Sequence, residues 1–317
     1  MPALRVPAGS DPFPERRLLP YEATCLEARR VLVVAPHADD ETLGCGGTLA
    51  GLLARGARLD VLLVTDGAAD EPDPTRRREI GEARLAETRE ALRRLGGGDA
   101  SCVFLPDRGL SSRPEEVIGV LRSALVETLP DLVFVPSPVE VHPDHRAVAE
   151  AFLSLWPGPS GRGLVAALPE ASRVAFYEVS QPIRPNVLVD VSLHAAVKEA
   201  AVGAFASQLS ARAYDSFARG LGAYRCMTLP VTATSAEALF VLPVSALPGL
   251  DPSRLLSALG PTLGAEEVLP EETGSRRTER SERYVPASCG RRTVPRCSGK
   301  RWRASRSRRG SSSRSSS

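Results

Sequence analysis

Short, continuous apolar runs alternate along the chain with segments of helical periodicity, and this alternation constrains the fold more than any other feature. The run Val31–Ala35 precedes a helical stretch at 42–55, and Leu59–Thr65 precedes a charged, amphipathic stretch at 75–95. Apolar runs of this length, without polar residues between, are typical of strands covered on both faces. We therefore predict an α/β fold built on a mostly parallel sheet.

The same alternation continues to about residue 245. Further helices are predicted over 114–128 and 144–156, with one or two more over 192–219. Further strands are predicted at Val103–Leu105, Asp131–Pro136, Val174–Glu178, Val187–Val191 and Ala238–Leu242. The pattern predicts one folded domain over residues 30–250, preceded by a leader at 1–29 and followed by a linker at 251–274.

The charge of the chain is divided unevenly. Residues 275–317 hold 13 arginines and one lysine against two glutamates, a net +12, whereas the whole chain carries +2, so residues 1–274 are net −10. The basic Arg/Ser-rich tail at 275–317 is predicted to be disordered, because it has too few apolar side chains to offset the entropy of ordering. Nonspecific attraction to nucleic acid is one role for such a tail; a shifted reading frame in a GC-rich gene is the other explanation.

No segment predicts export or a membrane span. The first 20 residues lack an apolar core of signal-peptide length, and no apolar stretch reaches about 18 residues. No cysteines form a C-x-x-C pair, which disfavours a cysteine-based zinc site and is consistent with reduced thiols. We expect a cytoplasmic protein, and nothing in the sequence indicates an oligomeric state.

Two clusters of metal-ligand residues follow predicted strands. The first is His37-Ala38-Asp39-Asp40-Glu41, directly after Val31–Ala35, and the second is His142-Pro143-Asp144-His145, after Asp131–Pro136. Ligands bind beyond the carboxyl ends of strands in open α/β sheets, and imidazole with carboxylate suits zinc. The alternative for the first cluster is a loop that caps the following helix through Asp40. Three of the four histidines fall in the two clusters, which favours a metal site; His194 is interpreted as an ordinary helical histidine.

Other catalytic motifs are absent. Gly44, Gly46 and Gly47 do not match the dinucleotide-binding spacing G-x-G-x-x-G, because Leu49 stands at its last position. No phosphate-binding G-x-x-x-x-G-K-[ST] and no serine-hydrolase G-x-S-x-G occurs either. The glycines are interpreted as allowing close packing of the helix behind the first cluster.

The segment at 30–50, RVLVVAPHADDETLGCGGTLA, resembles the opening signature of the LmbE-like/PIG-L family of zinc-dependent N-acetylglucosaminyl deacetylases, and HPDHRAV at 142–148 resembles its second signature. The resemblance covers roughly residues 29–245. It implies a Rossmann-like, three-layer α/β fold and one Zn²⁺ per chain. The family has proline where this chain has Ala38, which leaves the coordinating groups intact.

Roles follow from matching motif positions. His37, Asp40 and His145 resemble the zinc ligands, and Asp39 resembles the general base that takes a proton from the attacking water. His142 resembles the residue that stabilises the oxyanion or protonates the leaving amine. Asp144 is expected to orient His142 and to raise its pKa.

Two substrate contacts rest on looser matches. Arg84 and Asp107 fall where family members contact substrate; alternatively, they are an exposed helix charge and a turn aspartate. The resemblance predicts hydrolysis of the N-acetyl, or another N-acyl, group of a GlcNAc-type sugar conjugate, a small-molecule substrate. The alternatives are a zinc amidohydrolase for a non-sugar amide, since the same water chemistry serves any amide, and a catalytically silent sugar-binding protein.

Overall fold

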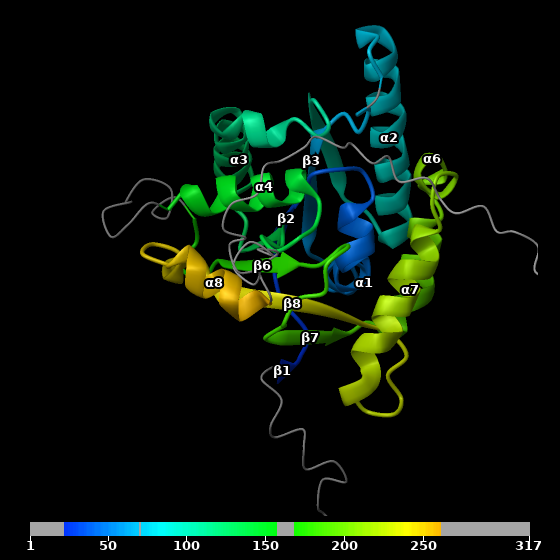
Figure 1. Cartoon of the computed structure of the whole chain (residues 1–317). Coiled ribbons are helices and arrows are strands. Elements are labelled where there is room, and N and C mark those ends of the chain that lie inside the picture. The colour runs from blue at the N-terminus through cyan, green and yellow to red at the C-terminus, as the bar shows by residue number, and fades with distance from the viewer. Residues whose placement is uncertain (1–21, 70, 157–167, 261–317) are drawn as a thin grey trace, which may run out of the picture. The chain divides into compact units, whose positions relative to one another are not determined.

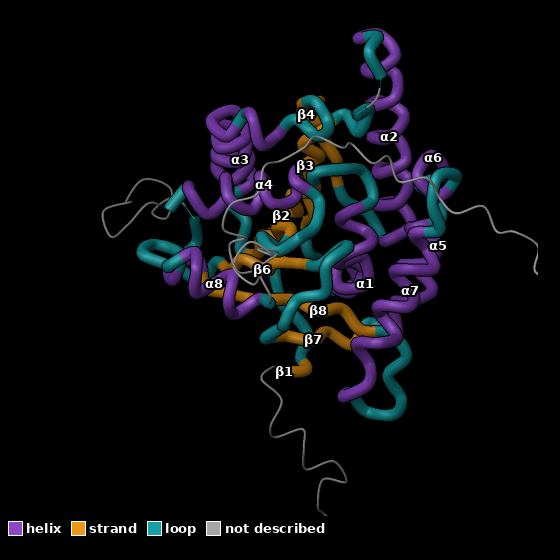
Figure 2. The backbone as a smooth tube through the Cα atoms, in the orientation of Figure 1, coloured by secondary structure: helices purple, strands orange, loops and turns teal. Residues whose placement is uncertain are grey.

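The computed structural model describes residues 22–69, 71–156 and 168–260. The described residues form a sheet of eight strands in the order β1-β7-β8-β6-β5-β2-β3-β4, flanked by helices (Figures 1 and 2). The strands are β1 (Glu22–Ala23), β2 (Arg30–Ala35), β3 (Arg58–Thr65), β4 (Asp99–Leu105), β5 (Leu132–Pro136), β6 (Arg173–Tyr177), β7 (Val187–Asp190) and β8 (Ala236–Pro243). The predicted basic tail lies outside the described residues.

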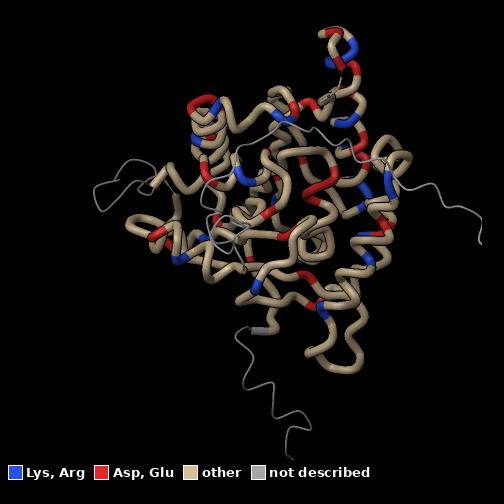
Figure 3. Tube along the Cα trace, viewed as in Figure 1, with Lys and Arg blue, Asp and Glu red and all other residues tan. Residues whose placement is uncertain are grey.

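Helices cover both faces of the sheet. They are α1 (Asp40–Ala54), α2 (Pro74–Leu95), α3 (Pro114–Thr128), α4 (Pro143–Ser154), α5 (Ala195–Val202), α6 (Ala206–Leu209), α7 (Tyr214–Arg225) and α8 (Pro252–Leu259). One apolar core packs α1, α2 and α5 against the sheet, and a second packs α3, α4 and α8 against the other face. Positively and negatively charged residues occur along the length of α2 (Figure 3). Among the described residues, none of the helices is long and apolar enough to cross a membrane.

The strand order fixes where a site can form. From β2 the chain runs outward through β3 to β4, and then returns to place β5 on the other side of β2; all these pairings, and that of β5 with β6, are parallel. The reversal of strand order between β2 and β5 is a topological switch point. In open α/β sheets, ligands bind in the crevice beyond the carboxyl ends of the strands at such a point.

The predicted fold class is confirmed, and the differences lie at element ends. Strand β4 begins four residues earlier than the apolar run that predicted it. Strand β8 is antiparallel to both neighbours, which the sequence pattern did not indicate. Glu22–Ala23 pairs with β7 although these residues were assigned to the leader, and α8 occupies part of the predicted linker. Leu255 and Leu259 of α8 are buried in the core, so the folded region extends past residue 250.

The glycines of α1 allow the close packing that the sequence suggested. A Cβ atom on Gly44 would lie 2.4 Å from Cδ2 of Tyr177, and one on Gly47 would lie 2.6 Å from Cβ of Val191. The helix is interrupted at Cys45, where φ is −141°. Just after this break, the buried carboxylate of Glu237 accepts hydrogen bonds from the backbone N–H groups of residues 47 and 48, which satisfies donors that the break leaves free.

Candidate metal centre and active site

The two motifs meet at the switch point. His37 follows β2, and His145 lies in the first turn of α4, which follows β5. Asp39 occupies the N-cap position of α1 with φ of 107°, in the left-handed region, and its side chain makes no capping hydrogen bond. The interpretation of this loop as a plain helix cap is therefore not supported. A non-glycine residue held in this region is strained by about 1–3 kcal/mol, and such strain clusters at functional sites.

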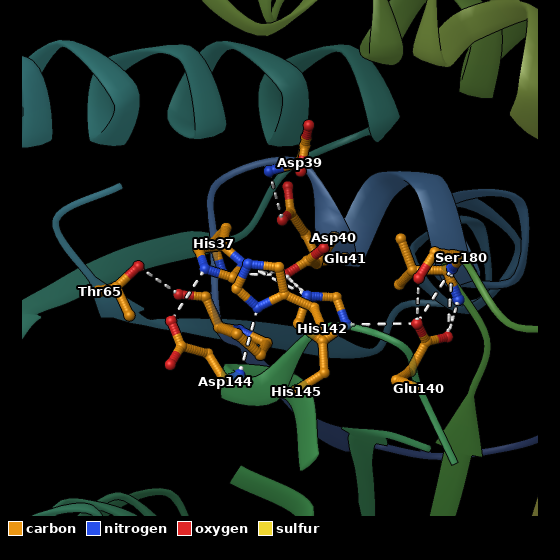
Figure 4. A network of polar contacts seen from close by, with 12 residues as sticks. His37, Asp39, Asp40, Glu41, Thr65, Glu140, His142, Asp144, His145 and Ser180 are labelled. Carbon is orange, nitrogen blue, oxygen red and sulfur yellow. Dashed lines mark hydrogen bonds and ion pairs between the residues drawn. The ribbon is translucent and has the colours of Figure 1, made fainter. Parts of the chain in front are cut away.

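Three donor atoms form a compact triangle (Figure 4). Nδ1 of His37 lies 3.2 Å from Nε2 of His145, and Oδ2 of Asp40 lies 3.3 Å from the first nitrogen and 3.1 Å from the second. All three side chains are buried. Two imidazole nitrogens and one carboxylate oxygen, all facing one point, form a donor set that suits zinc.

The triangle fits a tetrahedral metal ion. Zinc binds imidazole nitrogen and carboxylate oxygen at about 2.0–2.2 Å, which places the ligand atoms of a tetrahedron roughly 3.3 Å apart. Three protein ligands also leave a fourth position open, as catalytic zinc sites require. Other donor groups lie within 4.8 Å of one another, namely His37, His142 and His145, and His37, Asp107, His142 and Asp144. Both groups share His37 with the triangle, and the first also shares His145.

Carboxylates hold the opposite nitrogen of each imidazole. Nε2 of His37 lies 3.1 Å from Oδ1 of Asp107 and 3.4 Å from Oδ2 of Asp144. Nδ1 of His145 lies 3.6 Å from Oε2 of Glu140, and has no closer partner among the described residues. Partners of this kind fix the orientation and tautomer of metal-binding histidines. Asp107, predicted as a substrate contact, thus also touches a predicted metal ligand.

Glu140 was missed by the sequence analysis. Its fully buried carboxylate accepts hydrogen bonds from the backbone N–H groups of Val179 and Ser180 and from the hydroxyl of Ser180. It thereby links His145 to the loop after β6. A single glutamate two residues before the HPDH motif adds nothing to a helix or strand pattern. Its nearness in the sequence to the candidate metal ligand His145 is the signal that could have identified it.

The buried charges of the triangle shift one another's pKa. Burial opposes protonation of His145, but Asp40 and Glu140 outweigh it and raise the pKa of His145 to about 9. Burial likewise opposes protonation of His37, yet hydrogen bonds with the surrounding aspartates raise its pKa well above the ordinary value. Burial acts to raise the pKa of Asp40, but the two imidazoles hold it well below its usual range. The triangle therefore binds protons when it holds no metal.

Asp39 and Glu41, the neighbours of Asp40 in the first motif, have pKa values that shift in the opposite direction. Burial and the neighbouring carboxylates raise the pKa of Asp39 well above its ordinary value, and burial raises the pKa of Glu41 to about 7. Within the described residues, no hydrogen bond reaches the Asp39 carboxylate, which lines the adjoining cavity. The carboxylate of Glu41 instead accepts a hydrogen bond from the hydroxyl of Thr42. Asp39 is thus the carboxylate placed to exchange a proton with a molecule in the cavity.

Asp144 acts to raise the pKa of His142, as expected, but its effect is outweighed. Burial, together with His37 and His145, lowers the pKa of His142 overall. The Asp144 carboxylate accepts the N–H groups of Arg108 and Leu110. The backbone N–H of Asp144 donates to Nδ1 of His142. Asp144 therefore holds His142 through its main chain.

A cavity of about 660 Å³ opens over the triangle. Asp39, Arg84, Asp107 and His142 line it. The side chain of Arg84 lies against Gly67, where φ is +63° and a Cβ atom would lie 2.2 Å from the guanidinium. Nε of Arg84 is buried without a hydrogen-bond partner among the described residues. The predicted site residues thus gather around one cavity, whereas His194 lies elsewhere, against Gly51 of α1.

Comparisons with known proteins agree with this geometry. Residues 32–156 match the model of the PIG-L family, described as GlcNAc-PI de-N-acetylase. The diacetylchitobiose deacetylase of Thermococcus kodakarensis is 32% identical over 197 residues, covering 57% of this chain and 71% of that enzyme. The 1D-myo-inositol 2-acetamido-2-deoxy-alpha-D-glucopyranoside deacetylase of Kineococcus radiotolerans is 31% identical over 228 residues, covering 56% of this chain and 63% of that enzyme. The match thus spans less than two thirds of the Kineococcus enzyme.

A solved structure shares the fold. The conserved protein TT1542 from Thermus thermophilus superimposes with a TM-score of 0.56 and 32% sequence identity, covering 68% of this chain and 96% of that one.

Proposed function

Because this chain belongs to the LmbE-like/PIG-L family of deacetylases, we propose that it hydrolyses the N-acetyl, or another N-acyl, group of a GlcNAc-type sugar conjugate. The observation that carries the proposal is the triangle of His37, Asp40 and His145, with donor atoms 3.1–3.3 Å apart, beneath a cavity lined by Asp39. The chain would act as a zinc-dependent amide hydrolase on a small-molecule substrate.

The three residues of the triangle would hold one Zn²⁺ ion. Bound zinc supplies Lewis acidity, lowering the pKa of a water molecule from about 15.7 toward 7 and polarising the amide carbonyl. Asp107 and Asp144 lie at the outer nitrogen of His37, and Glu140 lies 3.6 Å from the outer nitrogen of His145, so these carboxylates would help to orient the two imidazoles toward the ion.

Asp39 would act as the general base. Its carboxylate lines the cavity and receives no hydrogen bond from the described residues, so it can accept the proton of the attacking water. The strained backbone at this residue directs the side chain toward the cavity rather than over the end of α1. Burial raises the pKa of Asp39, so this pKa lies closer to neutral pH than the pKa of an exposed aspartate does.

His142 would stabilise the oxyanion. Because its Nδ1 accepts the N–H of Asp144, its neutral form carries the proton on Nε2, which can donate a hydrogen bond to the developing negative charge. This role does not require the cationic imidazole that the sequence had suggested. Protonation of the leaving amine would require the imidazolium form of His142, so the proton that Asp39 takes from the attacking water is the one available to the amine.

Arg84 and Asp107 would bind the sugar. They line the same cavity, so the guanidinium of Arg84 would donate hydrogen bonds to hydroxyl groups of the substrate and the carboxylate of Asp107 would accept them. Asp107 is partly buried and keeps a low pKa, about 2, so it is ionised and can accept hydrogen bonds from hydroxyl groups at neutral pH.

The test is to purify the protein without added metal, measure zinc per chain, and assay acetate release from N-acetylglucosamine conjugates before and after chelation. We expect zinc near one per chain and acetate release that chelation abolishes and added zinc restores. Bound zinc without acetate release from any sugar conjugate would contradict the substrate class. A chain that takes up no zinc would contradict the metal site itself.

A further inference from the structure

A second cavity, of about 340 Å³, adjoins the first. The two share Leu43, Val179, Ser180 and Tyr214, whereas Arg84 and Asp107 line only the first. In Figure 4, Ser180 and Asp144 lie on opposite sides of the three imidazoles. Asp107 lies with Asp144 at Nε2 of His37, so the second cavity extends from the wall of the site opposite Asp107.

The lining of the second cavity is mainly apolar. Beyond the shared wall it consists of Pro182, Phe217, Ala218 and Leu221, with Arg212 stacked over the Phe217 ring. The hydroxyl and backbone N–H of Ser180 in the shared wall already donate to Glu140, which leaves the Tyr214 hydroxyl and the Arg212 guanidinium as the polar side-chain groups of the lining. A polar occupant would find few hydrogen-bond partners here, so an apolar one is favoured.

The walls of this cavity are fastened in place. Arg225, at the end of α7, donates from Nε to Glu178 and from its terminal nitrogen to the carbonyl of Ile183. Glu140 holds the same loop from the other side through Val179 and Ser180. A preformed wall lowers the entropic cost of binding, which is typical of a ligand subsite. For scale, an apolar cavity of about 150 Å³ binds benzene.

We propose that the second cavity is a subsite for an apolar substituent on C1 of the sugar. The proposal rests on the proposed function and follows from the constitution of the substrate. The reacting nitrogen is on C2, which lies between C1 and C3. If the hydroxyl on C3 faces Arg84 and Asp107, the substituent on C1 points the other way, toward Leu43, Val179 and the second cavity. An aromatic ring or short alkyl chain fits this space.

The test compares substrates that differ only in one apolar group. These are the methyl and phenyl glycosides of N-acetylglucosamine, as both anomers, and the methyl glycoside of N-hexanoylglucosamine. We expect the zinc-loaded protein to hydrolyse one phenyl glycoside with a kcat/KM at least about tenfold above the matching methyl glycoside, the ratio that a well-placed apolar group supplies.

Two variants of α7 make the test specific. Ala218→Trp fills the second cavity, and Ala223→Trp places the same ring on an exposed position of the same helix outside it. We expect Ala218→Trp to abolish the phenyl preference while hydrolysing the methyl glycoside within about threefold of the wild-type rate. Ala223→Trp should leave both rates unchanged.

The following outcomes would contradict the proposal. Equal kcat/KM for phenyl and methyl glycosides in the wild type, or equal effects of the two variants, would overturn the subsite. Loss of hexanoyl hydrolysis alone in Ala218→Trp would assign the cavity to the N-acyl chain instead. Absence of hydrolysis of all substrates by zinc-loaded protein would instead defeat the proposed function, and the subsite with it.

Discussion

Nδ1 of His37 and Nε2 of His145 lie 3.2 Å apart, although 108 residues separate them in the chain. The two histidines come from the ends of neighbouring parallel strands, β2 and β5, where the strand order reverses. Asp40 closes the triangle, and carboxylates hold the outer nitrogen of each ring. This arrangement places a metal-ligand set under a cavity, and the predictions below test its parts.

Replacing Asp39 by alanine should leave zinc binding intact and lower kcat by about 10²–10⁴, the usual contribution of a general base. Its carboxylate lies outside the triangle but faces the cavity. Zinc content and steady-state rates measure the two effects separately. Asp251→Ala, which removes an exposed acid from the start of α8, is the control. Near-normal turnover in Asp39→Ala would remove this residue from the mechanism.

Replacing His145 by alanine should lose both zinc and activity, because one corner of the triangle disappears. The matched control is His194→Ala, since His194 packs against Gly51 outside the cluster. Metal analysis after gel filtration gives the result. Full zinc occupancy in His145→Ala would exclude His145 from the ligand set.

Replacing Glu140 by glutamine should weaken zinc binding by about 10–100-fold, because the carboxylate that holds Nδ1 of His145 is lost. Competition with a chromogenic chelator measures the affinity. Glu150→Gln changes an exposed glutamate on α4, the helix that carries His145, and should bind zinc as the wild type does. An unchanged affinity in Glu140→Gln would reduce Glu140 to a support for the loop at 178–181.

Zinc binding at pH 7 should release protons, and zinc affinity should rise as the pH increases toward 9. The raised pKa of His145, about 9, means that this imidazole holds its proton below that pH when no metal is bound, and the pKa of His37 is raised as well. Zinc requires the neutral imidazole and must therefore displace the proton. Calorimetry in buffers of different ionisation enthalpy counts the protons released. Binding without proton release at pH 7 would show that the imidazoles are already neutral.

Gly44→Ala should destabilise the protein by about 1–3 kcal/mol, because its new methyl group would meet the buried ring of Tyr177. Gly220→Ala, within α7, would place its Cβ atom where no other atom lies within 4 Å, and should stabilise the protein by up to about 1 kcal/mol. Urea unfolding of the two variants gives both values. Equal effects would mean that α1 can shift away from β6 without loss.

The sequence by itself determined the fold class and the metal-ligand candidates. Continuous apolar runs are typical of strands buried on both faces, and helices between them favour parallel pairing, so His37 and His142–His145 were expected at one edge of the sheet. The glycines of α1 likewise indicated close packing, which the contacts with Tyr177 and Val191 bear out. These features are local, and each leaves a periodic or compositional pattern.

The tertiary structure alone decided the partners of these residues. Glu140 reaches His145, Asp107 and Asp144 reach His37, and the carboxylate of Asp144 accepts main-chain N–H groups. The lowered pKa of His142 and the apolar cavity beside α7 also arise from burial by distant segments. Burial and side-chain direction depend on which elements pack together in space, and no local pattern of residues encodes that.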